Sequence, residues 1–149
     1  MQCFPDTSAL VKRYVREFDS RRMRALWSDP ANVIYISQLT STELASALGR
    51  LLREGSVDVD FVRRATHAFR LDIGRRVRVL ALTPALQDVA ERLVFAHPLR
   101  AADALQLATA LAAARVVALA GEGLSFITAD RRQAAAALAE GLDVELLEG

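Results

Sequence analysis

Short apolar runs alternate with longer segments of helical periodicity along this chain. The short runs, rich in β-branched and aromatic residues, cover residues 2–4, 33–36, 76–80, 124–128 and 144–147. The helical patterns cover residues 8–14, 17–27, 40–54, 59–73, 84–95, 100–114 and 130–140. Strands that alternate with helices predict an α/β fold with a mostly parallel sheet, because parallel strands are joined by helical crossovers.

Length and composition narrow the class of protein further. The chain has 149 residues and no internal repeat or linker, so we expect one domain, residues 1–149, with its own core. The net charge of +1 demands neither a nucleic-acid nor a membrane partner. The most apolar stretch, residues 104–120, is interrupted by Arg115 and is too short to span a bilayer. The single cysteine, Cys3, allows no intramolecular disulfide, so we expect a cytoplasmic protein.

Four acidic residues stand in similar places along the pattern. Asp6 and Asp130 each follow a predicted strand and precede a helix, and Glu43 lies in the first turn of the helix after the second strand. The carboxyl ends of parallel strands share one edge of the sheet, where such folds place their ligand sites. We therefore expect Asp6, Glu43 and Asp130 along one rim. Asp103 also begins a helix, but that helix follows another helix, so the pattern constrains its position less.

Helix capping is the structural alternative for each of these acids. Thr40 and Glu43 have the spacing of a capping box, and Asp130 can serve as an N-cap. Asp6 and Asp103 near helix starts complement the helix dipole. Asp103, however, stands in an otherwise apolar segment, where an unpaired acid costs several kcal/mol. It therefore requires a partner, such as Arg100, or an ion.

Carboxylates without cysteine or histidine partners favour a hard cation with oxygen ligands, Mg²⁺ or Mn²⁺. An acidic rim that holds such an ion suits phosphoester hydrolysis, because the ion activates water and stabilises the leaving oxygen. The phosphate-binding signatures GxxxxGK[ST] and GxGxxG are absent from the sequence. Lys12 and Arg100 are the basic residues that we expect to contact the substrate phosphate.

Four segments together resemble the PIN-domain family, and specifically the VapC-type ribonuclease toxins of toxin–antitoxin pairs. They are DTSALVKRY at residues 6–14, TELASA at 42–47, LRAADALQLA at 99–108 and FITAD at 126–130. The resemblance covers essentially the whole chain. It implies a three-layer α/β fold, with a central mostly parallel sheet of four to five short strands and helices on both faces.

The resemblance also implies a site and partners. Asp6, Glu43, Asp103 and Asp130 would be the catalytic, metal-binding acids for Mg²⁺ or Mn²⁺. Ser8 and Thr128 would offer hydroxyls to the metal or its waters. Family members cleave RNA and typically form homodimers that a cognate VapB-type antitoxin silences with a C-terminal peptide laid over the site.

The sequence thus leads to a metal-dependent endoribonuclease as the hypothesis, leaving 5′-phosphate and 3′-hydroxyl ends by family precedent. Two alternatives stay open: an inactive PIN-like module that binds RNA or protein, and a metal-dependent phosphohydrolase that acts on a small substrate. The sequence departs from the family pattern at Pro5. We expect this residue to kink the strand end locally, because proline cannot donate a hydrogen bond to the neighbouring strand.

Overall fold

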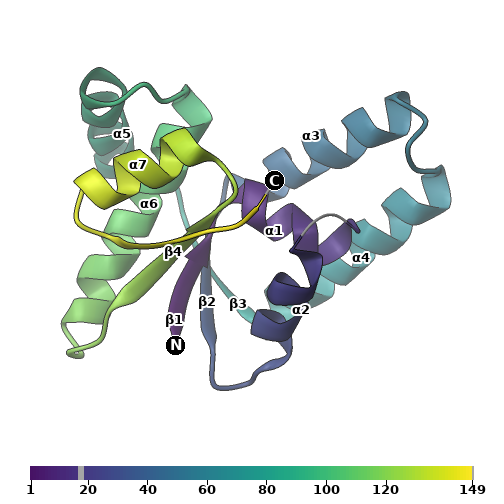
Figure 1. The fold of residues 1–149 in the computed structure, drawn as a ribbon, viewed down its shortest axis with the longest axis horizontal. Coiled ribbons are helices and arrows are strands. Elements are labelled where there is room, and N and C mark those ends of the chain that lie inside the picture. Colours follow the sequence, from purple (N-terminus) through teal and green to yellow (C-terminus); the bar gives the residue numbers. More distant parts are fainter. Residues whose placement is uncertain (17–18, 149) are drawn as a thin grey trace.

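A five-stranded parallel sheet forms the centre of the computed structural model, which describes residues 1–16 and 19–148. Its strands lie in the order β3-β2-β1-β4-β5, so β1, the first strand of the chain, is central (Figure 1). All four strand pairs are parallel. The strands are β1 (Gln2–Pro5), β2 (Val33–Ser37), β3 (Val77–Leu80), β4 (Leu124–Thr128) and β5 (Asp143–Leu146).

Seven helices of the described residues cover the two faces of this sheet (Figure 1). They are α1 (Thr7–Tyr14), α2 (Ser20–Ser28), α3 (Thr40–Arg53), α4 (Val59–Arg75), α5 (Pro84–Ala96), α6 (Ala101–Ala118) and α7 (Arg131–Ala139). Helices α1–α4 lie on one side of the sheet and α5–α7 on the other. The predicted three-layer α/β architecture is confirmed.

Each face of the sheet packs its own apolar core, because successive strand side chains point to opposite faces. Cys3 and Ile34 pack against α1–α4, whereas Phe4 and Tyr35 pack against α5–α7. The ring of Phe4 stacks on that of Phe126 from the neighbouring strand β4, with centroids 6.0 Å apart. These two cores hold the strand ends in fixed register.

Pro5 ends β1 without ending its ladder to β4. The N–H of Asp6 still donates to the carbonyl of Ile127 at 2.9 Å. In a strand, the N–H groups of successive residues point to neighbouring strands on opposite sides. Because the Asp6 N–H points to β4, an N–H at position 5 would point to β2. The pairing of β1 with β2 includes only Gln2 and Cys3. The N–H that proline lacks is therefore not required for pairing with β2.

Helix α6 is the longest apolar helix among the described residues. By length and composition it could cross a membrane, but 44% of it is buried inside the protein. Its buried residues belong to the core shared with α5, α7 and the sheet, which is where an all-round apolar helix is expected. It extends four residues beyond the predicted end at position 114. The helix predicted over 17–27 appears as α2, while positions 17 and 18 lie outside the described residues.

Candidate active site

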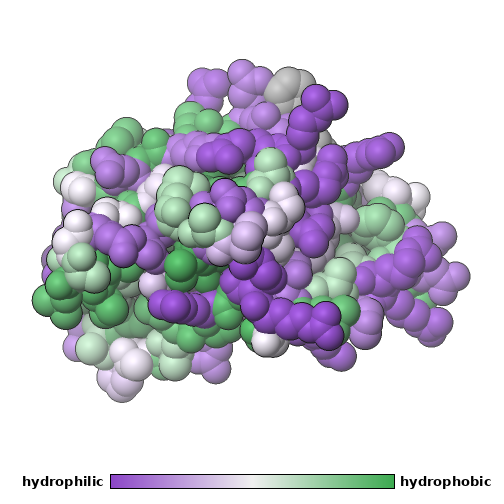
Figure 2. Space-filling model, turned by 90° about the horizontal axis from the view of Figure 1, so that it is seen from below, coloured by the Kyte–Doolittle hydropathy of each residue, from purple (hydrophilic) through white to green (hydrophobic). Residues whose placement is uncertain are grey.

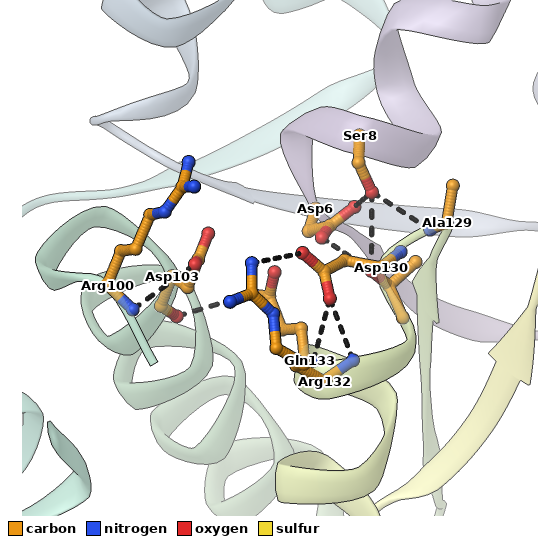
Figure 3. Close-up of polar contacts among 9 residues, drawn as sticks. Asp6, Ser8, Arg100, Asp103, Ala129, Asp130, Arg132 and Gln133 are labelled. Atoms are coloured by element: carbon orange, nitrogen blue, oxygen red, sulfur yellow. Dashed lines mark hydrogen bonds and ion pairs between the residues drawn. The ribbon is translucent and has the colours of Figure 1, made fainter. Parts of the chain in front are cut away.

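A cleft of about 600 Å³ opens at the carboxyl edge of the sheet. Four segments that are far apart in sequence line it: the starts of α1, α6 and α7, and one side of α3. Each contributes one of the four singled-out acids, Asp6, Glu43, Asp103 and Asp130. Figure 3 shows Asp6, Asp103 and Asp130 gathered around this space. The expected rim of acids is therefore present and includes Asp103.

Asp6 is enclosed at the end of β1, with 2% of its surface exposed. Its Oδ1 accepts hydrogen bonds from the Ser8 hydroxyl at 2.7 Å and the Ala9 N–H at 2.9 Å. Its Oδ2 accepts one from the Thr128 hydroxyl at 2.6 Å. Burial raises the pKa of Asp6 to about 6, and the charge of Glu43 adds to the rise, although these hydrogen bonds oppose it. A cation in the cleft would relieve this cost.

Ser8, labelled in Figure 3, and Thr128 join the start of α1 to the β4–α7 connection. While both donate to Asp6, Ser8 Oγ accepts the N–H of Ala129 at 2.9 Å and Thr128 Oγ1 accepts that of Asp130 at 3.0 Å. The two hydroxyl oxygens lie 3.3 Å apart. In this arrangement the hydroxyls fix the Asp6 carboxylate and tie it to the backbone that presents Asp130.

Asp130 and Asp103 both cap helices while they line the cleft. Asp130 Oδ1 accepts the N–H groups of Arg132 at 2.7 Å and Gln133 at 3.2 Å, as expected of an N-cap. Asp103 Oδ2 accepts the N–H of Arg100 at 3.3 Å. Burial raises the pKa of Asp103, and the nearby charge of Asp130 raises it further. Capping and a place in the cleft are thus combined in the same side chains.

Glu43 is held by neighbours from two other helices. Its Oε2 accepts hydrogen bonds from the Thr7 hydroxyl at 2.7 Å and from Gln106 Nε2. The same Nε2 lies 2.9 Å from Thr7 Oγ1 and 3.1 Å from Thr40 Oγ1. The capping box predicted for Thr40 and Glu43 is not formed, since α3 begins after Leu39 without a side-chain cap. The Glu43 carboxylate instead faces α1 and α6 across the cleft.

Positive charge lines the outer part of the same cleft. Arg50, Arg53 and Arg100 are exposed residues of its wall. Arg132 lies beside them with its guanidinium 3.9 Å from Asp130. Lys12 is only 3% exposed and does not line the cleft, so its contact with substrate stays a prediction without support from its position.

The donor set of the cleft fits a hard divalent cation. Four carboxylates provide oxygen ligands, and the raised pKa values of Asp6 and Asp103 reflect buried negative charge that a cation would balance. Gln106 Oε1 is a buried acceptor of the wall with no partner. Within residues 1–16 and 19–148, no three acidic, histidine or cysteine side chains already surround one point as a metal cage.

Among the polar residues of the cleft, Thr7, Gln106 and Gln133 form contacts with the acids or their helices and were not singled out from the sequence. Gln133 Nε2 donates to the backbone carbonyl of Asp103 at 3.2 Å and thereby links the starts of α6 and α7. Gln106 did carry a signal, because it is a polar residue on an apolar helix and lies three positions after Asp103, on the same face. Its contact with Glu43 joins residues 63 positions apart, which no local pattern reveals.

The chain is similar in sequence to a known family and to known proteins. The family model for the PIN domain matches residues 3–139. Ribonuclease VapC45 and Ribonuclease VapC49, from two strains of Mycobacterium tuberculosis, are each 34% identical over 107 residues. These alignments cover 72% of this chain and 73% of each relative.

Two solved structures share the fold at low sequence identity. One is Mycobacterium tuberculosis VapC20, described as a Sarcin-Ricin loop cleaving toxin, with a TM-score of 0.60 and 21% identity over 94% of this chain and 95% of that one. The other is VapBC2 from Rickettsia felis bound to a promoter DNA fragment, with a TM-score of 0.61 and 13% identity over 99% of this chain and 100% of that one.

Proposed function

Because this chain belongs to the PIN-domain family, we propose that it is a metal-dependent endoribonuclease and the toxin of a type II toxin–antitoxin pair. Its curated relatives are VapC ribonucleases, and the fold is that of VapC toxins. The reaction is hydrolysis of RNA phosphodiester bonds, carried out by residues 1–149 as a single PIN-like domain.

One observation carries this proposal. Four segments that are distant in sequence each deliver one acid to the same cleft, and these acids are Asp6, Glu43, Asp103 and Asp130. Helix capping alone requires no such convergence, because a cap acts within its own helix. Glu43 does not cap a helix at all, since its bonds go to Thr7 and Gln106.

Mg²⁺ or Mn²⁺ is the cofactor that suits these acids, with Asp6, Glu43, Asp103 and Asp130 as its ligands. When bound, such an ion lowers the pKa of a water molecule and stabilises the leaving oxygen of a phosphodiester. The chain's own contribution is to keep the acids in place. Ser8 and Thr128 fix Asp6 by hydrogen bonds to separate carboxylate oxygens.

The arginines of the cleft wall give the RNA backbone a place to bind. Arg100 stands beside Asp103, and Arg50 and Arg53 stand on α3, the helix that carries Glu43. Guanidinium groups form bidentate contacts with phosphate oxygens, and such contacts position a nucleic acid without reading its sequence. The acids then lie at the base of a cleft whose rim attracts phosphate.

A VapB-type antitoxin is the protein partner that we propose, together with a homodimer in the cytoplasm. The solved relatives from Rickettsia felis and Haemophilus influenzae are VapBC proteins. Figure 2 shows hydrophobic residues gathered on the half of the surface that carries α5–α7. Separately, Phe95 of α5 is 92% exposed. An apolar groove between α5 and α6, lined by Val94, Ala104 and Leu105, lies on the same half and would be covered in a dimer.

Cleavage of mixed total RNA by the purified protein tests the proposal. The wild type is incubated with MgCl₂, MnCl₂ or EDTA beside Asp6→Asn, Asp103→Asn and the matched control Asp88→Asn, an exposed residue outside the cleft. Cleavage is expected in the wild type and the control with metal only, and its loss by 10²-fold or more in both cleft variants. Circular dichroism checks that all variants are folded.

The product ends distinguish this reaction from metal-independent RNA cleavage. New 5′ ends should accept label from a kinase only after phosphatase treatment, because the expected product carries a 5′-phosphate. If folded wild type and cleft variants leave RNA equally intact under every metal condition, an inactive RNA- or protein-binding module explains the fold better. Hydrolysis of a small phosphate ester without RNA cleavage would favour the phosphohydrolase alternative.

A further inference from the structure

A second cavity, of about 550 Å³, lies away from the acidic cleft. It opens to the surface and is bordered by the end of α1, by α2 and by the end of α4, which meet on the same side of the sheet (Figure 1). The two cavities have no lining residue in common. Helix α1 takes part in both sites, with Thr7, Ser8 and Val11 at the cleft and Arg13 at this cavity.

Three arginines and one acid line the second cavity: Arg13, Arg24, Arg76 and Asp72. Asp72 is engaged on both sides, because Tyr14 donates its hydroxyl to it at 2.6 Å and the Arg13 guanidinium lies 3.7 Å away. The single carboxylate therefore balances about one of the three positive charges.

The other two guanidinium groups keep their charge unbalanced. Arg76 donates to backbone carbonyls, those of Trp27 at 3.0 Å and Asp29 at 2.9 Å, which hold it in place without neutralising it. Neither Arg24 nor Arg76 takes part in an ion pair with any described residue. The cavity thus has an excess of two positive charges.

Two buried hydrogen-bond donors of the residues around this cavity have no partner. Buried side-chain atoms without a partner are rare in native proteins, and four occur among the described residues. Two of these are acceptors and lie elsewhere, whereas the two donors, Arg13 Nε and Trp27 Nε1, both belong to residues of this wall. Trp27 is 4% exposed, so solvent water does not accept a hydrogen bond from its indole N–H.

We propose that this cavity binds a phosphate monoester group in its dianionic form. A dianion matches the excess of two positive charges, and its several oxygens can accept from the guanidinium groups of Arg13, Arg24 and Arg76 together. A carboxylate carries one charge and two oxygens, and would leave part of this donor set unused. The site is independent of the acidic cleft and of the reaction proposed there.

Tryptophan fluorescence reports on this site directly, because Trp27 is the only tryptophan of the chain. The full-length protein is titrated with inorganic phosphate, acetate and chloride at constant ionic strength, with excitation at 295 nm. The proposal predicts a saturable change in emission with phosphate and none with chloride. A response to acetate as tight as that to phosphate would overturn the phosphate assignment.

Two variants on one helix make the test specific. Arg24→Gln removes a charge from the cavity wall, while Arg21→Gln removes one from the exposed surface of α2 a single turn earlier. Arg24→Gln removes a charged hydrogen bond to the phosphate, so phosphate affinity should fall about tenfold in this variant. The affinity should stay unchanged in Arg21→Gln, which removes no such bond. Equal affinities in both variants, or no phosphate response in the wild type, would refute the site.

The same fluorescence titration shows whether the ligand is free phosphate or the phosphate group of a nucleotide. Adenosine 5′-monophosphate and adenosine are titrated beside inorganic phosphate. Tighter binding of the nucleotide than of phosphate, with no response to adenosine, identifies a nucleotide-borne monoester as the ligand. Equal binding of nucleotide and phosphate identifies free phosphate. A response to adenosine that matches the nucleotide contradicts recognition through the phosphate.

Discussion

Replacing Asp6 by asparagine should stabilise the metal-free protein at neutral pH although it removes one of the proposed catalytic acids. Burial raises the pKa of Asp6 to about 6 from an ordinary value of 3.8. The folded protein at pH 7 therefore carries a buried charge that the unfolded chain holds in water without cost. A rise of this size corresponds to about 3 kcal/mol of unfolding free energy, which the neutral amide would recover.

Hydrogen bonding offsets part of this gain. An asparagine Oδ1 can keep the bonds from the Ser8 hydroxyl and the Ala9 N–H, but its Nδ2 would face Thr128 Oγ1, which now donates to the carboxylate. The Thr128 hydroxyl must turn and accept instead. One altered hydrogen bond costs about 1 kcal/mol, so we expect a net gain of about 1–2 kcal/mol.

The pH dependence gives the sign of the effect. Between pH 3.8 and about 6 the folded wild type keeps a proton on Asp6 that the unfolded chain has already released. The stability of the wild type therefore falls as the pH rises through this window, and the loss is complete above it. Asp6→Asn lacks this slope, so its stability relative to the wild type should be lowest near pH 4 and highest at pH 7.5.

Urea unfolding followed by circular dichroism measures this difference. The wild type, Asp6→Asn and the exposed control Asp88→Asn are compared in EDTA at pH 4, 5, 6 and 7.5, and again with MnCl₂. Added metal should stabilise the wild type more than Asp6→Asn, because it interacts with the carboxylate. If Asp6→Asn is no more stable than the wild type at pH 7.5 in EDTA, or if the difference does not change with pH, the assigned cost of burying Asp6 is wrong.

Three further changes test other parts of the molecule. Gln106→Met should lower RNA cleavage at least tenfold at saturating metal, because the Glu43 carboxylate loses a donor, and an unchanged rate would contradict this. Glu140→Gln should lower the urea midpoint at pH 7, since Arg92 and His97 hold the pKa of Glu140 down to about 2; this loss should fade as the pH falls from 4.5 towards 2. Phe95→Glu should shift the protein towards monomer in light scattering, and an unchanged mass would place the dimer interface elsewhere.

The position of the acids could be predicted because it depends on strand direction. Asp6 follows β1 and Asp130 follows β4, and these strands are parallel neighbours. Glu43 follows β2, which pairs with the other side of β1. The place of Asp103 could not be derived in this way, because α6 follows α5 and the direction of a helix after a helix depends on packing against the sheet.

Lys12 shows where sequence proximity misleads. It lies six residues after Asp6, which in an α-helix is a rotation of roughly 240° from the side that carries the acid. The residue is accordingly buried on a different side of α1. Arg50, by contrast, is seven residues after Glu43, close to two full turns, and lines the cleft with it. Helical periodicity would have favoured Arg50 over Lys12 as a cleft residue.

The central place of β1 bears on the order in which the protein becomes functional during synthesis. The ribosome makes this strand long before its partner β4, which is translated about 120 residues later. Until β4 and the start of α7 emerge, Asp6 lacks the Thr128 hydroxyl, and Asp130 does not exist. A nascent chain that ends before residue 124 therefore cannot assemble the cleft, and nuclease activity would arise only after β4 and the start of α7 have been made.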